Sequence, residues 1–177
     1  ILPPILDLPR LDPKTTEDHI LVYLPFEDQN LTTTWLHGFS DQRFIQYSPD
    51  VTDEAQGNVV RRKANIHGFK RDLAAAKGVI CNTGFELISE CLQWRKPVLT
   101  RPLAKQMEQL SNAAALEQLG YATTMQSLET QAARGWFDAM PEAPDVHFED
   151  VASALAEWLA RGASRPVAEL SRQLWSR

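Results

Sequence analysis

The segment 79–90 has the residue types of an anion-binding turn between a strand and a helix. An apolar run over 79–81 predicts a buried strand, and Asn82, Thr83 and Gly84 form a turn that leads directly into a helix over 85–94. Such a turn aims free backbone N–H groups and the positive end of a helix dipole at one point. Phosphate binds well there, and glycine lets it approach the backbone closely. Many α/β proteins carry a turn of this kind, so the turn alone identifies no ligand.

Two further positions could bind hydroxyl groups. Glu90 follows the turn by about two helical turns, and its carboxylate could accept hydrogen bonds from a ribose diol. Glu108 and Gln109 put a carboxylate and an amide side by side at the predicted start of a helix over 108–119, which suits the vicinal hydroxyls of a sugar. The alternative for this pair is a solvated first turn in which the helix dipole favours an acid.

Strands and helices alternate along the chain. Apolar runs predict strands over 20–24, 43–47, 58–62, 79–81, 97–100 and 121–124, with a loop over 49–57. Helices are predicted over 31–39, 69–76, 85–94, 108–119, 127–140, 148–161 and 166–175. This order predicts an α/β fold: a Rossmann-like three-layer sandwich with a parallel sheet. Ligands of such sheets bind beyond the carboxyl ends of the strands, so the residues after Leu24, Arg62, Cys81 and Thr100 are the candidates for a site.

The ends of the chain differ from its centre. Four prolines within residues 1–14 block regular structure and predict a linker over 1–19 that continues from an upstream domain. A frayed terminus is the alternative. The α/β domain is predicted over 20–162, and a separate C-terminal helix over 163–177.

Composition excludes several other classes. The net charge of −5 argues against nucleic acid as a partner, and the tight basic cluster Arg61-Arg62-Lys63 suits a solvated strand end. No apolar run approaches the roughly 18 residues of a transmembrane segment, and no signal peptide is visible. The two cysteines suit a small core role in a cytoplasmic protein, and the four histidines are too scattered for a metal site.

The stretch 78–120 resembles the donor-binding region of GT-B glycosyltransferases. The group includes the bacterial enzyme that adds N-acetylglucosamine to the lipid-linked peptidoglycan precursor, and the transferases that use UDP-glucuronic acid or UDP-glucose. The shared pattern comprises Gly84, Glu90, Lys96-Pro97, Val98-Leu99, Glu108-Gln109, Asn112-Ala113 and Leu119-Gly120. The resemblance implies that this chain is one half of a GT-B architecture and acts in a glycosyltransferase of the hexosyltransferase type.

The resemblance also assigns roles to residues. It implies that Glu90 binds the ribose and that Gly84 with the following N–H groups holds the pyrophosphate. It places Glu108 and Gln109 on the transferred sugar, and the segment 65–69 against the base. The implied donor-binding residues are Asn82, Thr83, Gly84, Phe85, Glu90, Glu108, Gln109 and Asn112. The implied base-proximal residues are Ile66, His67 and Phe69, with contacts mostly through the backbone.

The resemblance further implies what the chain lacks. The donor is a nucleotide sugar, UDP-linked, and no metal or covalently bound cofactor is expected, because helix dipoles neutralise the leaving diphosphate. The acceptor and the catalytic base would come from an N-terminal acceptor-binding domain of the same protein. No catalytic residue is therefore assigned here, and this chain alone is expected to be inactive.

Three features depart from the pattern. Many relatives have a histidine at the position of Asn82 and a serine or threonine at that of Leu87, and both would touch phosphate. Glu27 and Asp28 occupy the first loop, where an acidic pair beside a pyrophosphate weakens its binding unless the pair points away.

Two alternatives remain open: half of a nucleotide-sugar epimerase, and a non-catalytic nucleotide-sugar-binding module. An NAD-binding domain is disfavoured because no GxGxxG follows the first strand.

Overall fold

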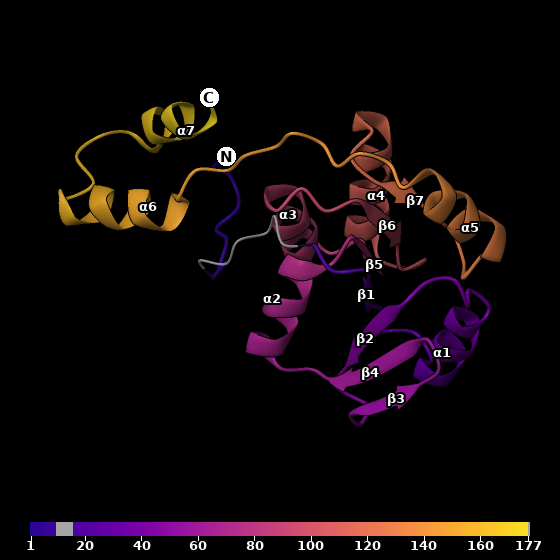
Figure 1. The fold of residues 1–177 in the computed structure, drawn as a ribbon. Coiled ribbons are helices and arrows are strands. Elements are labelled where there is room, and N and C mark those ends of the chain that lie inside the picture. Colours follow the sequence, from indigo (N-terminus) through magenta and orange to yellow (C-terminus); the bar gives the residue numbers. More distant parts are fainter. Residues whose placement is uncertain (10–15, 177) are drawn as a thin grey trace.

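A computed structural model describes residues 1–9 and 16–176 (Figure 1). These residues form one seven-stranded sheet in the order β3-β4-β2-β1-β5-β6-β7. The strands are β1 (Ile20–Tyr23), β2 (Phe44–Ser48), β3 (Glu54–Gln56), β4 (Val59–Lys63), β5 (Gly78–Asn82), β6 (Val98–Arg101) and β7 (Thr123–Thr124). Every neighbouring pair is parallel except β3 and β4, which are antiparallel.

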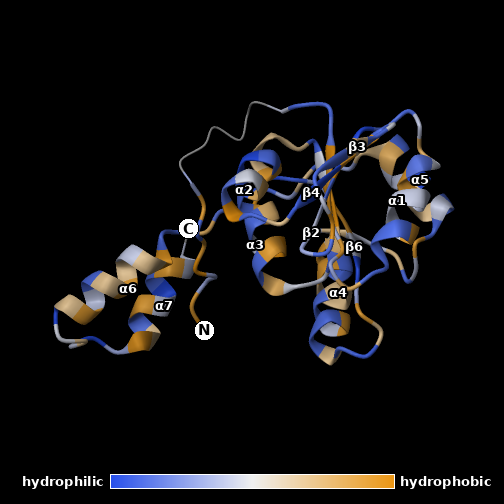
Figure 2. Ribbon diagram, turned by 90° about the horizontal axis from the view of Figure 1, so that it is seen from below, coloured by the Kyte–Doolittle hydropathy of each residue, from blue (hydrophilic) through white to orange (hydrophobic). Residues whose placement is uncertain are grey.

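Helices cover both faces of the sheet. They are α1 (Gln29–His37), α2 (Ile66–Ala75), α3 (Phe85–Gln93), α4 (Met107–Leu119), α5 (Thr130–Ala139), α6 (Val151–Ala160) and α7 (Val167–Trp175). One apolar cluster packs α1 and α5 on the sheet, and another packs α2, α3 and α4 on the opposite face. In Figure 2 the apolar strands lie between helices whose outer sides are hydrophilic.

The strand β1 shows why the sequence folds in this way. Ile20 and Val22 belong to the cluster with α1 and α5, whereas Leu21 belongs to the cluster on the other face. Because side chains alternate across a strand and both faces are covered, a buried parallel strand reads as a continuous apolar run. The predicted α/β fold with helices on both faces is therefore confirmed.

Two local predictions were wrong. The predicted loop over 49–57 contains β3, which forms a hairpin with β4 across a two-residue turn at Gly57 and Asn58. Gly57 has a φ of 55°, which glycine adopts without strain, and the edge strand is too polar to show the apolar pattern of a strand. The helix α2 begins at Ile66 rather than at residue 69, because Asn65 caps it by accepting a hydrogen bond from the Gly68 N–H.

The last two helices form a small cluster beside the sheet. Val151 of α6 packs with Leu170 and Leu174 of α7, and Leu2 lies against the same cluster. Figures 1 and 2 both show this pair next to the main body, with the N-terminal segment alongside. Residues 10–15 of the predicted linker lie outside the described residues. The division of the chain at 19 and 162 stays a prediction, although α6 and α7 share one cluster.

Candidate functional site

The carboxyl ends of the central parallel strands meet at one edge of the sheet. The residues that follow β1, β4, β5 and β6 there begin the helices α1, α2, α3 and α4. Apart from Asn82, which ends β5, all the donor-binding and base-proximal residues expected from the sequence lie in these segments or in the helices that follow them. Ligands of open α/β sheets bind at this edge, so the geometry here decides what the chain can bind.

The turn between β5 and α3 is held from several sides. Gln109 of α4 accepts the Thr83 N–H at 3.3 Å, and Asn112 donates to the Thr83 carbonyl at 3.2 Å. The Thr83 hydroxyl bonds the Thr100 hydroxyl at 2.8 Å, and Thr83 is fully buried. These bonds fix the peptide just before Gly84, so the start of α3 is presented in one defined position.

The N-terminus of α3 has the properties of an anion site. Gly84 is the N-cap residue, and no side chain of the described residues caps this helix. A Cβ at Gly84 would meet none of the described atoms within 4 Å, and its φ of −75° is open to any residue. The fold therefore does not require glycine here. Free N–H groups with open space before them are what a phosphate needs.

The acidic loop after β1 has partners within the fold. Asp28 caps α1 by accepting hydrogen bonds from the N–H groups of Asn30 and Leu31, both at 2.9 Å. Glu27 forms an ion pair with Arg101, and both side chains are largely buried. Arg101 ends β6, beside Asn82, whose side chain donates to the Arg101 carbonyl at 3.0 Å. A cation therefore neutralises the Glu27 charge at the same edge as the α3 N-terminus.

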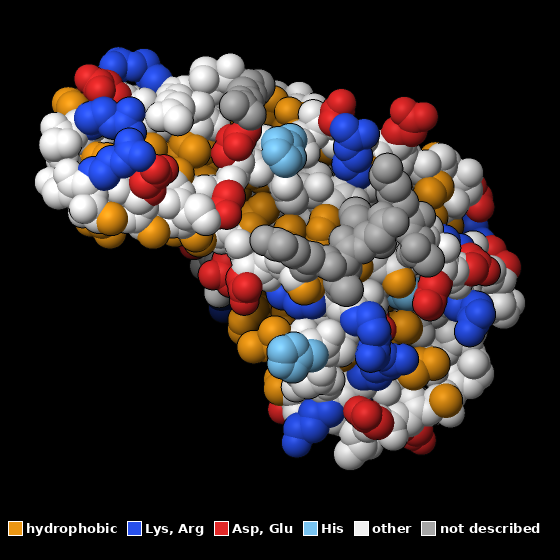
Figure 3. Space-filling model, turned by 60° about the vertical axis from the view of Figure 1, so that its left-hand side comes forward, with side chains coloured by type: hydrophobic (Ala, Val, Ile, Leu, Met, Phe, Trp, Pro, Cys, Tyr) orange, Lys and Arg blue, Asp and Glu red, His pale blue; other side chains and the backbone are white. Residues whose placement is uncertain are grey.

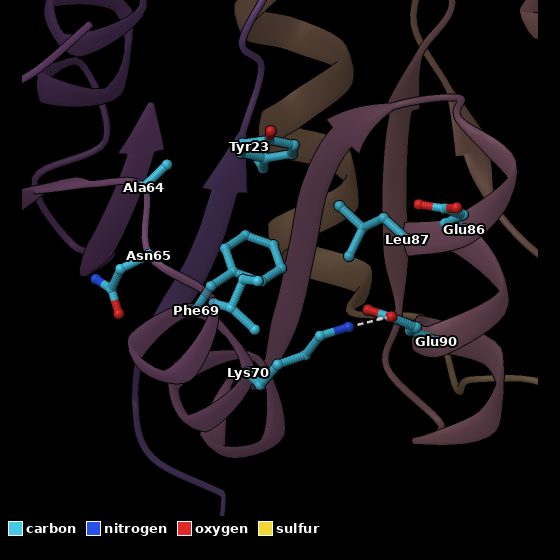
Figure 4. Close-up of a pocket in the computed structure, with 9 residues that line it drawn as sticks. Tyr23, Ala64, Asn65, Phe69, Lys70, Glu86, Leu87 and Glu90 are labelled. Carbon is cyan, nitrogen blue, oxygen red and sulfur yellow. Dashed lines mark hydrogen bonds and ion pairs between the residues drawn. The ribbon is translucent and has the colours of Figure 1, made fainter. Parts of the chain in front are cut away.

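A cavity of about 360 Å³ opens between α2 and α3 (Figure 4). Its lining residues are Tyr23, Ala64, Asn65, Ile66, Phe69, Lys70, Glu86, Leu87 and Glu90. The fold thus brings the expected ribose residue Glu90 together with the expected base-proximal residues Ile66 and Phe69. It separates His67 from them, because this side chain lines a polar cavity beside β3 and β4 instead. His67 lies in α2, which begins three residues before the predicted start of this helix at residue 69.

Glu90 is buried and carries an ion pair. Its carboxylate bonds the amine of Lys70, and the two side chains are 10% and 15% exposed. In Figure 4 they point toward each other from neighbouring helices. Burial raises the pKa of Glu90 above its ordinary value, while Lys70 acts in the opposite direction. The carboxylate lines the cavity, so it can bond a ligand as well as Lys70.

Glu108 and Gln109 have different surroundings. Glu108 is exposed in the first turn of α4, whereas Gln109 is buried. The Gln109 amide oxygen accepts N–H groups from Thr83 and Leu103, and its amide nitrogen donates to Gln106 at 2.9 Å. These bonds give Gln109 a positioning role, and its direct contact with a sugar stays a prediction.

Sequence reasoning missed Lys70, Arg101 and Tyr23. Arg101 directly follows Thr100, a strand end that the sequence had singled out, so a signal for it existed. Lys70 gave none, because a single lysine on an amphipathic helix usually lies in solvent. Tyr23 was assigned only to a buried strand, but it packs edge-to-face on Phe69 with ring centroids 5.2 Å apart. Only the packing of β1, α2 and α3 makes it part of the cavity wall.

The surface and the remaining side chains add little to the site. On the face shown in Figure 3, basic and acidic side chains are interspersed instead of forming one basic area. Within residues 1–9 and 16–176, no group of three or more His, Cys, Asp or Glu side chains could hold a metal ion. The described helices include none that is long and apolar enough to cross a membrane. The expected absence of metal and nucleic acid stays a prediction.

The fold and this edge define a class of proteins: Rossmann-like α/β domains that bind a ligand beyond the strand ends. Residues 1–141 match the sequence profile of glycosyl transferase family 1, and the chain belongs to this family. It therefore carries a glycosyltransferase domain. No curated protein matches the chain.

Solved glycosyltransferases share the fold. The glycotransferase of kitacinnamycin is 19% identical, with a TM-score of 0.55 over 73% of this chain and 36% of that protein. SnogD from Streptomyces nogalater is 16% identical, with a TM-score of 0.52 over 90% of this chain and 46% of that protein. The spinosyn forosaminyltransferase SpnP is 15% identical, with a TM-score of 0.50 over 79% and 40%. The chain matches a GT-B half-domain and spans less than half the length of these proteins.

Proposed function

We propose that this chain binds a nucleotide diphosphate sugar, UDP-linked, as the donor for transfer of a hexose to an acceptor. An N-terminal domain of the same protein would bind that acceptor and supply the catalytic base. The chain alone would then be inactive, because half of the cleft is absent. Within the family, the motif over 78–120 supports a relationship to the peptidoglycan N-acetylglucosaminyltransferase and UDP-glucuronosyltransferase group. A cytoplasmic location and the absence of a protein-bound metal belong to the same proposal.

One observation carries the proposal: the uncapped N-terminus of α3 lies on the same helix as the buried carboxylate of Glu90. The two are six residues apart, or about 9 Å along the helix axis. Gly84 leaves the N-terminus open, and Glu90 lines a cavity that also has aromatic walls. An anion site beside a hydroxyl-binding carboxylate and an apolar wall suits the phosphate, ribose and base of one nucleotide.

The remaining residues take parts that follow from their surroundings. Gly84 and Phe85 present backbone N–H groups to the diphosphate, and Thr83, with Asn82 and Asn112, holds the turn. Glu108 contacts the transferred sugar, because it is exposed at the same edge. Gln109 acts mainly by fixing Thr83.

Arg101 supplies the cation that the site needs near the diphosphate. Many relatives have a histidine at the position of Asn82, and this chain has a guanidinium at the end of the adjacent strand. In the structure Glu27 pairs with Arg101. Exchange of this carboxylate for a phosphate keeps the guanidinium paired, and guanidinium binds phosphate with two parallel hydrogen bonds.

Two alanine variants test the proposal. Glu90→Ala should weaken the binding of UDP and of UDP-sugar by the same factor, because both ligands contain ribose. A hydrogen bond to a charged group is worth about 1.5–3 kcal/mol, or about ten- to a hundredfold in affinity. Glu108→Ala should leave UDP binding unchanged and weaken only the sugar-bearing ligand. Isothermal titration calorimetry with UDP and a set of UDP-sugars gives both values, and thermal melts control for folding.

The same titrations can refute the proposal. Parent-like affinities in both variants would show that Glu90 and Glu108 do not contact the ligand. Tighter binding of NAD than of every nucleoside diphosphate would replace the ligand class altogether. Sugar transfer by the 177-residue chain itself would disprove the dependence on a second half.

A further inference from the structure

The cavity wall contains an ion pair that no expectation from the sequence included. Lys70 comes from α2 and Glu90 from α3, and their side chains meet at the wall drawn in Figure 4. Both are mostly buried, with 15% and 10% of their side chains exposed. A salt bridge in such a place is weak evidence for stability, because desolvation of the two ions opposes their attraction. A role in the site accounts for it better.

The surroundings of Glu90 oppose its ionised form. Burial acts most strongly, and the carboxylates of Glu86 on the same helix and Asp7 of the N-terminal segment add negative charge. Lys70, from α2, is the group that acts in the opposite direction by bonding the carboxylate. Without this amine the pKa of Glu90 would rise further. A protonated carboxyl group carries an O–H donor, has fewer acceptor sites than a carboxylate and is a weaker acceptor.

We infer that Lys70 is a positioning residue that holds Glu90 as an acceptor for both ribose hydroxyls, and that the pair makes the site select ribonucleotides over 2′-deoxyribonucleotides. The inference deepens the proposed function and rests on it. A carboxylate held at one oxygen by an amine cannot turn away from the cavity. A 2′-deoxyribose lacks one of the two hydroxyl groups, so part of the acceptor capacity of the Glu90 carboxylate stays unused. Sites built around hydrogen bonds discriminate strongly against such analogues.

The position of the pair on α3 assigns it to the nucleoside and not to the diphosphate. Glu90 follows the N-cap Gly84 by about 9 Å along the helix. Lys70 is bonded to Glu90 at that depth, beside the aromatic ring of Phe69. Lys70 should therefore affect uridine and UDP alike. A lysine that binds phosphate would affect UDP alone.

Calorimetry on the 177-residue chain tests the inference with three probes: UDP, 2′-deoxy-UDP and uridine. The parent should prefer UDP over 2′-deoxy-UDP by about tenfold or more. Lys70→Met should reduce this preference to about threefold or less and weaken uridine and UDP by the same factor. Lys70→Arg should keep the preference, because it keeps the cation. Glu90→Gln should lose the preference for UDP over 2′-deoxy-UDP. In the double variant, Lys70→Met should change this preference little beyond the effect of Glu90→Gln alone.

A pH series gives a readout that a merely structural role would not move. In Lys70→Met, the rise of UDP affinity with pH should move to higher pH than in the parent, because loss of the amine raises the pKa of Glu90 further and a proton then competes with the ligand for it. In the parent and in Lys70→Arg this rise should be complete at a lower pH, because the cation keeps the carboxylate ionised. Thermal melts check folding, and Lys70→Gln replaces Lys70→Met if the latter is unfolded.

The outcomes separate the two levels of the argument. If the parent prefers UDP but Lys70→Met keeps both this preference and the pH profile of the parent, the role of Lys70 is wrong and the proposed function stands. Loss of UDP affinity with unchanged uridine affinity would also overturn it, in favour of a phosphate contact. If the parent binds no nucleoside diphosphate, the proposed function fails and the inference fails with it.

Discussion

Replacing Gln109 with alanine would test how the site is built. The structure buries this side chain to 6% exposure and uses its amide oxygen to accept the N–H groups of Thr83 and Leu103. Alanine removes the acceptor and leaves both N–H groups without it. The sequence alone favours a different result, in which the variant affects only the sugar-bearing ligand.

The expected cost follows from the burial of those two groups. A buried N–H that loses its partner costs about 1–3 kcal/mol. Thr83 is fully buried, whereas Leu103 is half-buried, so water can partly replace the lost acceptor there. The sum is about 2–4 kcal/mol of unfolding free energy, which corresponds to a fall in Tm of roughly 4–16 °C in a domain of this size. The loosened turn should weaken UDP and UDP-sugar alike.

Urea denaturation of the parent and two variants measures this cost. Glu108→Ala is the matched control, because it changes the neighbouring residue on the same helix turn but an exposed one. Its stability should stay within about 0.5 kcal/mol of the parent. If Gln109→Ala is equally stable and weakens only the UDP-sugar, the positioning role is refuted and the direct sugar contact is supported.

Three further predictions concern the turn, the cation and the core. Gly84→Ala should change the free energy of unfolding by less than about 1 kcal/mol, because the added Cβ meets none of the described atoms. The weaker N-cap preference of alanine lowers stability, and the smaller entropy of the unfolded chain raises it, so the two effects oppose each other. Gly84→Ala should weaken UDP but not uridine in calorimetry, and unchanged UDP affinity would remove the phosphate from this turn. Arg101→Met should likewise weaken the binding of UDP but not of uridine. Glu27→Gln should strengthen UDP binding, because it releases the guanidinium of Arg101. The reverse order of UDP affinities would contradict the exchange of the Glu27 carboxylate for a phosphate. Burial raises the pKa of Cys81 to about 12 and that of Cys91 well above its ordinary value, so a thiol reagent at pH 8 should label neither until denaturant is added. Rapid labelling of the native chain would contradict their burial.

The sequence determined the fold class because its signals are local. A strand covered on both faces, such as β1, reads as a nearly continuous apolar run, and Gly120 ends α4 in the left-handed conformation that glycine adopts without strain. The sequence did not predict the β3 hairpin, because an exposed edge strand has no apolar pattern. The sequence did not predict the start of α2, because the Asn65 cap depends on one side-chain hydrogen bond, which the Gly68 N–H donates.

The sequence also singled out Gly84 and Glu90, since a strand–glycine–helix turn and a carboxylate six residues later lie on one continuous element. It could not determine which partners these residues meet. Lys70 reaches Glu90 from another helix, and Arg101 reaches Glu27 across β5. Gln109 reaches Thr83 from 26 residues away. Burial and ion pairing depend on contacts between distant segments, so the charge state of Glu90 and the role of Gln109 were decided only when α2, α3 and α4 packed on the same face of the sheet.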